Sequence, residues 1–506
     1  MTFDEALEVA RRNPGDPDAV EALADIALDS DEEEAALPLV SAATVRFPSN
    51  ARIWQWLGLL HRALDDRRAA IPAFDTAMRL APQDAGIAHS RARVALEAGL
   101  PAVDLFEAAS RLAPSDGAVL LGRGAAHLAE GNGAQAVEDL ARLLRANPLW
   151  LEGHADLAQL RWIMGDREGF LASIEVALVQ APRAAALWQL LVHKLIDAGD
   201  FGGTLAAVAK ARMFLGEQPF LVAADAVAHS ETGAVGLADA CFTRLDQVSD
   251  ISLAVRRIRH QLRTGRLGQA LVEIDKWTGD PAANFVWPYA AIAWRIAGDP
   301  RLQWLEGDAA LVSVMDLSDS LPPLDRLAPV LQTLHHSNTE QFDQSVRGGT
   351  QTEGVLFQRI EPEICALRAA IAQAVERHIQ QLPPVAPGHP VLGRRRDRPI
   401  RFSGSWSVRL EGEGFHANHI HPAGWLSSAL YVALPPSLGE GDGRAGWLAL
   451  GEPQSELGLG IGPTRFIEPK PGRLVVFPST MWHGTLPFVH GERLTVAFDV
   501  RPPTPR

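Results

Sequence analysis

Proline recurs at a nearly constant spacing through the first part of this chain. Successive prolines are 34, 34, 32, 34 and 34 residues apart, at Pro14, Pro48, Pro82, Pro114, Pro148 and Pro182. A period of this length marks a supersecondary unit that cannot bury its apolar face alone, so neighbouring units must stack. Because proline does not continue a helix, the spacing predicts helical hairpins that each end near a proline.

The unit that begins at Ala51 has a distinctive residue pattern. Its residues are Trp54, Leu57, Gly58, Ala70, Phe74, Ala77 and Pro82. This pattern resembles the tetratricopeptide repeat, in which small residues let two helices approach and large ones fill the gap to the next unit. The units from Gly117 and Leu151 keep part of the pattern. Looser Ala-rich stretches continue after Pro182, and we predict a repeat array over residues 1–300.

The resemblance to tetratricopeptide repeats implies a stacked array with a long groove that binds extended peptides or partner proteins. The alternative is that the array only shields the second domain or joins two copies of the chain. The partner expected from the analogy is therefore a protein or peptide, and oligomerisation through the array remains open.

Residues 301–506 are expected to form a second domain. Helical spacing of apolar residues over much of 301–385 predicts a helical lead-in, and residues 386–400, rich in Pro, Gly and Arg, predict a linker. Within the lead-in, the stretch 344–352 contains Gly348 and Gly349 and is expected to be a loop. Arg347 in this loop is either a substrate contact or part of an ordinary turn.

From Phe402 onward the apolar residues alternate with a two-residue period. Five strands are expected, at residues 405–410, 427–434, 446–450, 473–477 and 493–500. Short strands separated by Gly, Pro and Asp suggest a sandwich or barrel over 401–502. The fold class expected for the whole chain is multi-domain α + β.

Histidines and an arginine follow one another in this last part of the chain. On a strand, His419 and His421 project from the same face. The strand-like run 473–478 leads to His483, and Arg493 opens another such run ten residues later. Imidazole suits Fe(II), and a guanidinium fork suits a carboxylate. This pattern favours Fe(II) held beside a dicarboxylate cosubstrate.

These motifs resemble those of the 2-oxoglutarate/Fe(II)-dependent oxygenases, which have a jelly-roll (double-stranded β-helix) core. The matching segments, in the order of the family, are residues 405–408, 419–422, 427–432, 469–478, 483 and 493–495. The resemblance implies His419 and His483 as metal ligands, and Arg493 as the partner of the far carboxylate of 2-oxoglutarate. It implies Fe(II), 2-oxoglutarate and O2 as cofactor, cosubstrate and oxidant.

Further residues are candidates for this site. Thr495 shares the face of Arg493 and can add a hydroxyl hydrogen bond to the cosubstrate. Tyr431 is a second candidate donor, although packing explains it equally well. Arg347 and Trp406 are candidates for contact with the substrate.

One position departs from the commonest pattern of the superfamily, which has a carboxylate two residues after the first histidine. Here that residue is His421, and we predict it to be the third ligand. The alternatives are water, or a carboxylate from Glu440 or Asp442. His416 has the opposite strand parity and is expected to lie outside the ligand set.

Composition limits the remaining function classes. The net charge is −14, with 47 Lys and Arg against 61 Asp and Glu, which disfavours nucleic-acid binding. The basic run 393–398 is expected to be a solvated loop. Two cysteines, no signal peptide and no long apolar run predict a soluble cytoplasmic protein without a disulfide framework or a membrane span.

The expected activity is hydroxylation of a C–H bond, on a protein or peptide side chain that the array recruits. Two alternatives remain at this point. One is a three-histidine iron dioxygenase that needs no 2-oxoglutarate, and the other is a non-catalytic repeat scaffold.

Overall fold

The computed structural model describes residues 1–337, 339–340, 342, 344–436, 438 and 443–503. The chain forms two compact units. The first contains Met1–Leu140 and Glu353–Ala369, and the second contains Ala141–Thr352 and Ala370–Pro503. The domain boundary expected near residue 300 stays a prediction.

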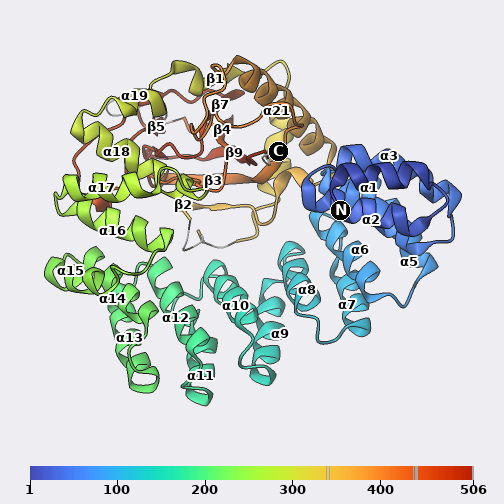
Figure 1. Cartoon of the computed structure of the whole chain (residues 1–506), viewed down its shortest axis with the longest axis horizontal. Helices are drawn as coiled ribbons and strands as arrows, with labels where there is room; N and C mark the ends of the chain where they lie inside the picture. The colour runs from blue at the N-terminus through green and yellow to red at the C-terminus, as the bar shows by residue number, and fades with distance from the viewer. Residues whose placement is uncertain (338, 341, 343, 437, 439–442, 504–506) are drawn as a thin grey trace. The chain divides into compact units, whose positions relative to one another are not determined.

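Seventeen consecutive helices form the N-terminal part of the chain (Figure 1). Their bounds are α1 Phe3–Arg12, α2 Pro17–Ser30, α3 Glu33–Arg46, α4 Ala51–Ala63, α5 Arg67–Leu80, α6 Ala85–Glu97, α7 Val103–Leu112, α8 Gly117–Ala129, α9 Gly133–Ala146, α10 Leu151–Ile163, α11 Ala172–Gln180, α12 Ala185–Asp197, α13 Phe201–Leu215, α14 Pro219–Glu231, α15 Val235–Arg244, α16 Ile251–Arg263 and α17 Leu267–Trp277.

The proline period has a local physical cause. In the repeats up to α8, the residue two positions after the proline is an Asn or Asp that caps the next helix, as Asn50 and Asp84 do for α4 and α6. Their side chains accept backbone N–H groups that the first turn leaves without a partner. The same proline–cap spacing fails at Trp150 and Ala184, which have no side-chain cap.

Small residues set the packing of the helix pairs, as the repeat pattern predicts. A Cβ on Gly58 of α4 would lie 2.8 Å from the ring of Phe74 on α5. A Cβ on Gly122 of α8 would lie 2.2 Å from the ring of Phe106 on α7. Only glycine allows these rings to approach the neighbouring backbone this closely.

The remaining helices follow the array, and several of them alternate with strands along the chain. They are η1 Ala283–Phe285, α18 Trp287–Ala297, α19 Arg301–Glu306, η2 Ala309–Leu311, α20 Leu324–Gln332, η3 Leu356–Gln358, α21 Pro362–Gln381 and η4 Ser455–Leu457. Residues 386–400 form turns and bends. Within the second unit, Trp287 and Trp294 of α18 share one apolar cluster with Leu457 and Trp482 from the strand region. The array and the sheets therefore have a common core there.

The strands form two antiparallel sheets. Their bounds are β1 Ser313–Asp316, β2 Val346–Gln351, β3 Phe402–His416, β4 Leu426–Ala433, β5 Leu448–Leu450, β6 Arg465–Ile467, β7 Arg473–Pro478, β8 His483–Thr485 and β9 Arg493–Val500. The larger sheet has the order β1-β7-β4-β9-β3-β2, and the smaller has the order β6-β5-β8. The predicted fold class, a helical repeat array followed by antiparallel sheets, is confirmed.

The lead-in differs from its prediction because it supplies two strands. β1 pairs with β7, and β2 pairs with β3 where a loop was expected at 344–352. Gly349 explains the difference, since a Cβ there would lie 2.3 Å from the carbonyl oxygen of Arg409. The glycine pair thus permits close approach of two strands rather than marking a loop, and the loop prediction is wrong.

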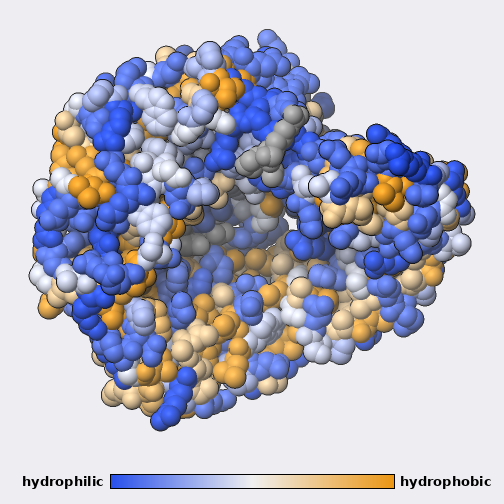
Figure 2. Space-filling view, viewed as in Figure 1, coloured by the Kyte–Doolittle hydropathy of each residue, from blue (hydrophilic) through white to orange (hydrophobic). Residues whose placement is uncertain are grey.

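Three features concern the helices and the surface. No helix in the described ranges is long and apolar enough to cross a bilayer. In the basic run, Arg395 pairs with Asp397. Apolar side chains appear among polar ones over α11 and α13 (Figure 2), where Val179 and Met213 are exposed.

Candidate metal and cosubstrate site

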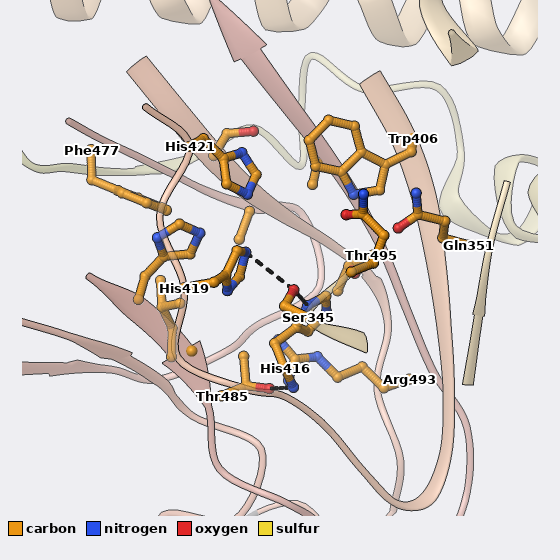
Figure 3. A pocket seen from close by; sticks show the side chains of 17 residues that line it. Ser345, Gln351, Trp406, His416, His419, His421, Phe477, Thr485, Arg493 and Thr495 are labelled. Carbon is orange, nitrogen blue, oxygen red and sulfur yellow. Dashed lines mark hydrogen bonds between the residues drawn. The ribbon is translucent and has the colours of Figure 1, made fainter. Parts of the chain in front are cut away.

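Three histidines converge where two extended segments run antiparallel. His419 and His483 exchange both backbone hydrogen bonds, at 2.9 and 3.0 Å, and the N–H of His421 donates to the carbonyl of Ser479 at 2.9 Å. Because Ile420 separates the two histidines, their rings project from one side. Candidate ligand atoms of His419, His421 and His483 all lie within 4.8 Å of one another (Figure 3).

Backbone carbonyls fix the rings of two of these histidines. Nδ1 of His419 lies 2.8 Å from the carbonyl oxygen of Ala417, and Nδ1 of His483 lies 3.0 Å from that of Met481. A carbonyl only accepts, so Nδ1 carries the proton in both rings. The lone pair is then on Nε2, which is the form in which imidazole binds a metal ion.

A carboxylate fixes the third ring. Nδ1 of His421 lies 2.7 Å from Oδ2 of Asp499, the penultimate residue of β9. The hydroxyl of Ser427 donates to the other carboxylate oxygen and lies 2.9 Å from that of Ser479. This network orients His421 with Nε2 free, as carboxylates behind metal-bound histidines do.

Burial keeps the site in its neutral form. It lowers the pKa of His419 and of His483 well below the ordinary value, and the neighbouring imidazoles lower both further. Burial also lowers the pKa of His416 to about 3. His416 stacks on His419 with the ring centres 6.1 Å apart, and it is not part of the three-histidine cluster. The rings of His416, His419 and His483 are therefore neutral near pH 7 without needing a metal to displace protons.

Ser345 also reaches this cluster. Its hydroxyl lies 3.2 Å from Nε2 of His419 and 3.3 Å from Nδ1 of His416. Since Nδ1 of His419 already donates, the hydroxyl donates to the Nε2 lone pair. A metal ion would use that same lone pair, so this hydrogen bond and metal binding at His419 exclude each other.

Arg493 is a buried cation in the same pocket. Its side chain is 2 % exposed, one Nη donates to the carbonyl of Gly446 at 3.1 Å, and Nε has no partner. Its guanidinium lies 5.2 Å from the centre of the Tyr431 ring. No acidic side chain pairs with it among the described residues, and burial lowers its pKa. An uncompensated buried charge is costly, so this is an arrangement suited to an anionic ligand.

Of the other predicted site residues, two line the pocket and two do not. Thr495 and Trp406 line the pocket with Arg493. Tyr431 is buried behind it, and its hydroxyl has no partner. Arg347 is exposed on β2, where it donates to the carbonyls of Gln344 and Val346, and it does not line the pocket. The roles proposed for these residues stay predictions.

Several residues at the site were not predicted from the sequence. Gln344, Gln351 and Ser428 line the pocket, and Asp499 lies behind His421. Strand parity could have identified Asp499, which follows Arg493 and Thr495 at even steps along β9. Glu440 and Asp442, the alternative carboxylate donors, lie outside the described residues.

Two other histidines have defined positions. His335 lies 2.9 Å from the hydroxyl of Thr350 and 3.3 Å from that of Ser407. It therefore braces β2 against β3. His490 is exposed.

Comparison with known proteins finds a related family for the strand region. Residues 404–499 match the family model described as Putative 2OG-Fe(II) oxygenase. This segment is similar to the oxygenase domains that the model describes. The match covers all three histidines, Arg493 and Asp499, and the family implies Fe(II), 2-oxoglutarate and O2 in general terms.

Solved structures resemble separate parts of the chain. A prolyl-4-hydroxylase from Pseudomonas putida is 20 % identical, with 38 % of this chain and 92 % of that chain covered and a TM-score of 0.26. A tetratricopeptide repeat protein from Parabacteroides merdae is 17 % identical, with 46 % and 93 % covered and a TM-score of 0.29. YrrB, described as a repeat protein with an unusual peptide-binding site, is 18 % identical, with 37 % and 96 % covered and a TM-score of 0.29. Scores this low establish no shared function. No match was found among curated proteins.

Proposed function

We propose that this chain is a 2-oxoglutarate- and Fe(II)-dependent dioxygenase that hydroxylates a C–H bond on a protein or peptide side chain. One observation carries the proposal. Three imidazoles whose Nε2 atoms carry a lone pair line the same pocket as Arg493, a buried cation that has no acidic partner among the described residues.

The donor set fits Fe(II). His419, His421 and His483 would hold the ion through Nε2, because each Nδ1 is already hydrogen-bonded. Three neutral ligands leave the ion with more positive charge than two histidines and a carboxylate would. Asp499, hydrogen-bonded to the far side of His421, supplies a negative charge close by.

The pocket also fits a dicarboxylate cosubstrate. Arg493 offers Nε and a planar fork of N–H groups, a geometry that matches a carboxylate. Thr495 lies two residues further along the same face, and the hydroxyl of Tyr431 is available as a donor from behind. Donors suited to a carboxylate, on Arg493 and Thr495, thus line the same pocket as the histidines.

When bound, Fe(II) and 2-oxoglutarate supply the oxidative chemistry: one O2 converts 2-oxoglutarate and R–H into succinate, CO2 and R–OH. The chain's own residues position these groups and limit water. Leu448, Phe477 and Ala429 form apolar walls beside His483, and Trp406 packs 5.6 Å from the ring of His421. Phe477 also packs edge-on against His483, with ring centres 4.7 Å apart, and so fixes that ring.

A first experiment tests the cosubstrate. Calorimetric titration with 2-oxoglutarate, without oxygen and in the presence of Mn(II) or Fe(II), should show binding by the wild type and much weaker binding by Arg493→Gln. Binding to neither protein would favour the rival three-histidine dioxygenase.

A second experiment tests the reaction. Succinate should form when Fe(II), ascorbate, 2-oxoglutarate and oxygen are supplied with candidate peptides, and His483→Ala should abolish this turnover together with iron binding. If the protein binds iron but forms no succinate with any peptide set, the proposal is contradicted. That result would favour the alternative of a non-catalytic repeat scaffold. Arg465→Ala, at an exposed position of β6 outside the pocket lining, serves as the control.

A further inference from the structure

Phe342, which precedes the pocket residues Gln344 and Ser345, is held by the repeat array. Its ring centre lies 5.2 Å from that of Trp162 on α10 and 5.8 Å from that of Phe170. The ammonium of Lys194 on α12 lies 5.0 Å above the same ring. Phe342 is buried in this aromatic and cationic pocket, whose geometry favours an aromatic side chain.

Glu340 is recognised through both its side chain and its backbone. Arg167 donates to its carboxylate at 2.9 Å, and Nε1 of Trp162 donates to its backbone carbonyl at 3.0 Å. The hydroxyl of Thr339 donates to the backbone carbonyl of Trp162 at 3.1 Å. Main-chain hydrogen bonds combined with side-chain pockets are the way in which proteins recognise extended peptides.

The array departs from its repeat at this place. α11 begins only at Ala172, nine residues after α10 ends at Ile163, whereas α5 begins four residues after α4 ends. The turn residues in between carry Arg167 and Phe170. The guanidinium of Arg167 lies 5.0 Å from the ring of Trp162, and the ring of Phe170 lies 5.0 Å from it. The shortened helix therefore brings together a site that the regular repeats lack.

We propose that Trp162, Arg167, Phe170 and Lys194 form a docking subsite for an extended peptide with an acidic residue two positions before an aromatic one. The chain's own Glu340 and Phe342 fill this subsite in the structure and are an internal ligand that a protein substrate replaces. The proposal rests on the oxygenase function only where it calls the partner a substrate.

Because Glu340 and Phe342 belong to the same chain as the subsite, a free peptide must compete with them for binding. A short linker gives an internal ligand an effective concentration on the order of millimolar. A free peptide should therefore bind the wild-type chain poorly and bind well once the internal ligand is removed. A whole protein substrate has an advantage because it can contact further repeats.

The test uses a labelled synthetic peptide of residues 337–345 and full-length protein, with binding measured by fluorescence anisotropy without metal or 2-oxoglutarate. The double variant Glu340→Ala/Phe342→Ala should bind the peptide at least tenfold more tightly than the wild type. Adding Trp162→Ala to the double variant should remove this binding. A peptide with the same composition in scrambled order is the control. Equal affinity of wild type and double variant, or equal affinity for the scrambled peptide, overturns the proposal.

A charge exchange covers the case in which the double variant folds poorly. The side chain of Arg167 is 48 % exposed, so Arg167→Glu should leave the fold intact. Arg167→Glu is introduced into the double variant or into Phe342→Ala alone. In either background it should weaken binding of the native peptide. It should strengthen binding of a peptide in which Lys replaces the residue corresponding to Glu340. No preference for the exchanged peptide contradicts the proposal. Because these measurements need no turnover, their failure is distinguishable from failure of the oxygenase assignment.

Discussion

Nδ1 of His421 and Oδ2 of Asp499 are 2.7 Å apart, so an imidazole lies between this carboxylate and the point at which the three histidines converge. The oxygenases that this segment resembles most commonly have a carboxylate at the position of His421. Here the negative charge is retained but lies one ring further away. This relationship makes Asp499 the residue whose replacement should most affect the properties of the metal site without removing a ligand.

We expect Asp499→Asn to weaken metal binding by about 10- to 100-fold, the effect typical of losing the partner of a metal-bound histidine. The amide can still accept from Nδ1 but carries no charge. Anaerobic titration with Co(II), followed by its visible spectrum, measures both affinity and ligand geometry. Asp316→Asn, at an exposed carboxylate of β1, is the matched control. Wild-type affinity in Asp499→Asn would show that the charge of Asp499 is unimportant.

Arg493→Gln should separate ligand binding from stability. A hydrogen bond to a charged group contributes about 1.5–3 kcal/mol, so 2-oxoglutarate affinity should fall by roughly 10- to 100-fold. The ligand-free protein should lose no stability, because the variant removes a buried charge that lacks an acidic partner. Calorimetry and thermal unfolding measure the two effects. Arg493→Lys keeps the charge but not the fork, and wild-type affinity in that variant would contradict pairing through the fork.

Gly349→Ala should destabilise the second unit and disturb the pocket wall. The added Cβ would meet the carbonyl oxygen of Arg409 at 2.3 Å, so β2 must move away from β3 and take Gln351 with it. Overpacking of this kind costs about 1–3 kcal/mol. Gly268→Ala on α17 meets nothing within 4 Å and should instead be neutral or stabilising by up to about 1 kcal/mol. Urea unfolding of both variants checks the contrast, and equal midpoints would refute it.

His378 on α21 should make stability depend on pH. Burial lowers its pKa to about 4, from an ordinary value of 6.5, and its Nε2 has no partner. Between pH 6.5 and 4 the unfolded imidazole binds a proton that the folded one does not, so stability falls as the pH falls through this range. Above pH 6.5 both forms are neutral and the contribution is complete.

The size of this effect follows from about 1.4 kcal/mol per pH unit for one group. The loss of unfolding free energy between pH 7 and pH 5 should be smaller by about 2 kcal/mol in His378→Asn than in the wild type. Asn can keep the contact that Nδ1 makes with Ser313. His193→Gln, at an exposed position, should leave the pH dependence unchanged. The same pH dependence in both variants would place the titrating group elsewhere.

Local signals in the sequence were enough for much of the fold. The proline period and the strand alternation predicted the helical array and the main strands, because caps, turns and two-residue alternation act over a few neighbouring residues. The position of Arg493 at the start of β9 follows from the same alternation. Parity also predicted that His419 and His421 share a face, and their rings do converge.

What the sequence did not show depends on pairing between distant segments. β2 looked like a loop because Gly348 and Gly349 have low strand propensity, and only the approach of Arg409 explains them. Ser345 lies at His419 because β2 pairs with β3, a partner 70 residues away in the sequence. Asp499 was within reach of a parity argument, but its partner His421 comes from a separate segment.

Trp482, which immediately precedes His483, donates its indole N–H to the carbonyl of Pro288 at 2.9 Å and packs edge-on against Tyr289. A fragment that starts at residue 301 would lack both Pro288 and Tyr289. The indole of Trp482 would then lose these contacts directly beside His483, a candidate iron ligand. Inactivity of such a truncation would thus say nothing about substrate recruitment. A deletion that retains residues 141–506 would keep that neighbourhood intact, and it is the fairer way to ask what the earlier repeats contribute.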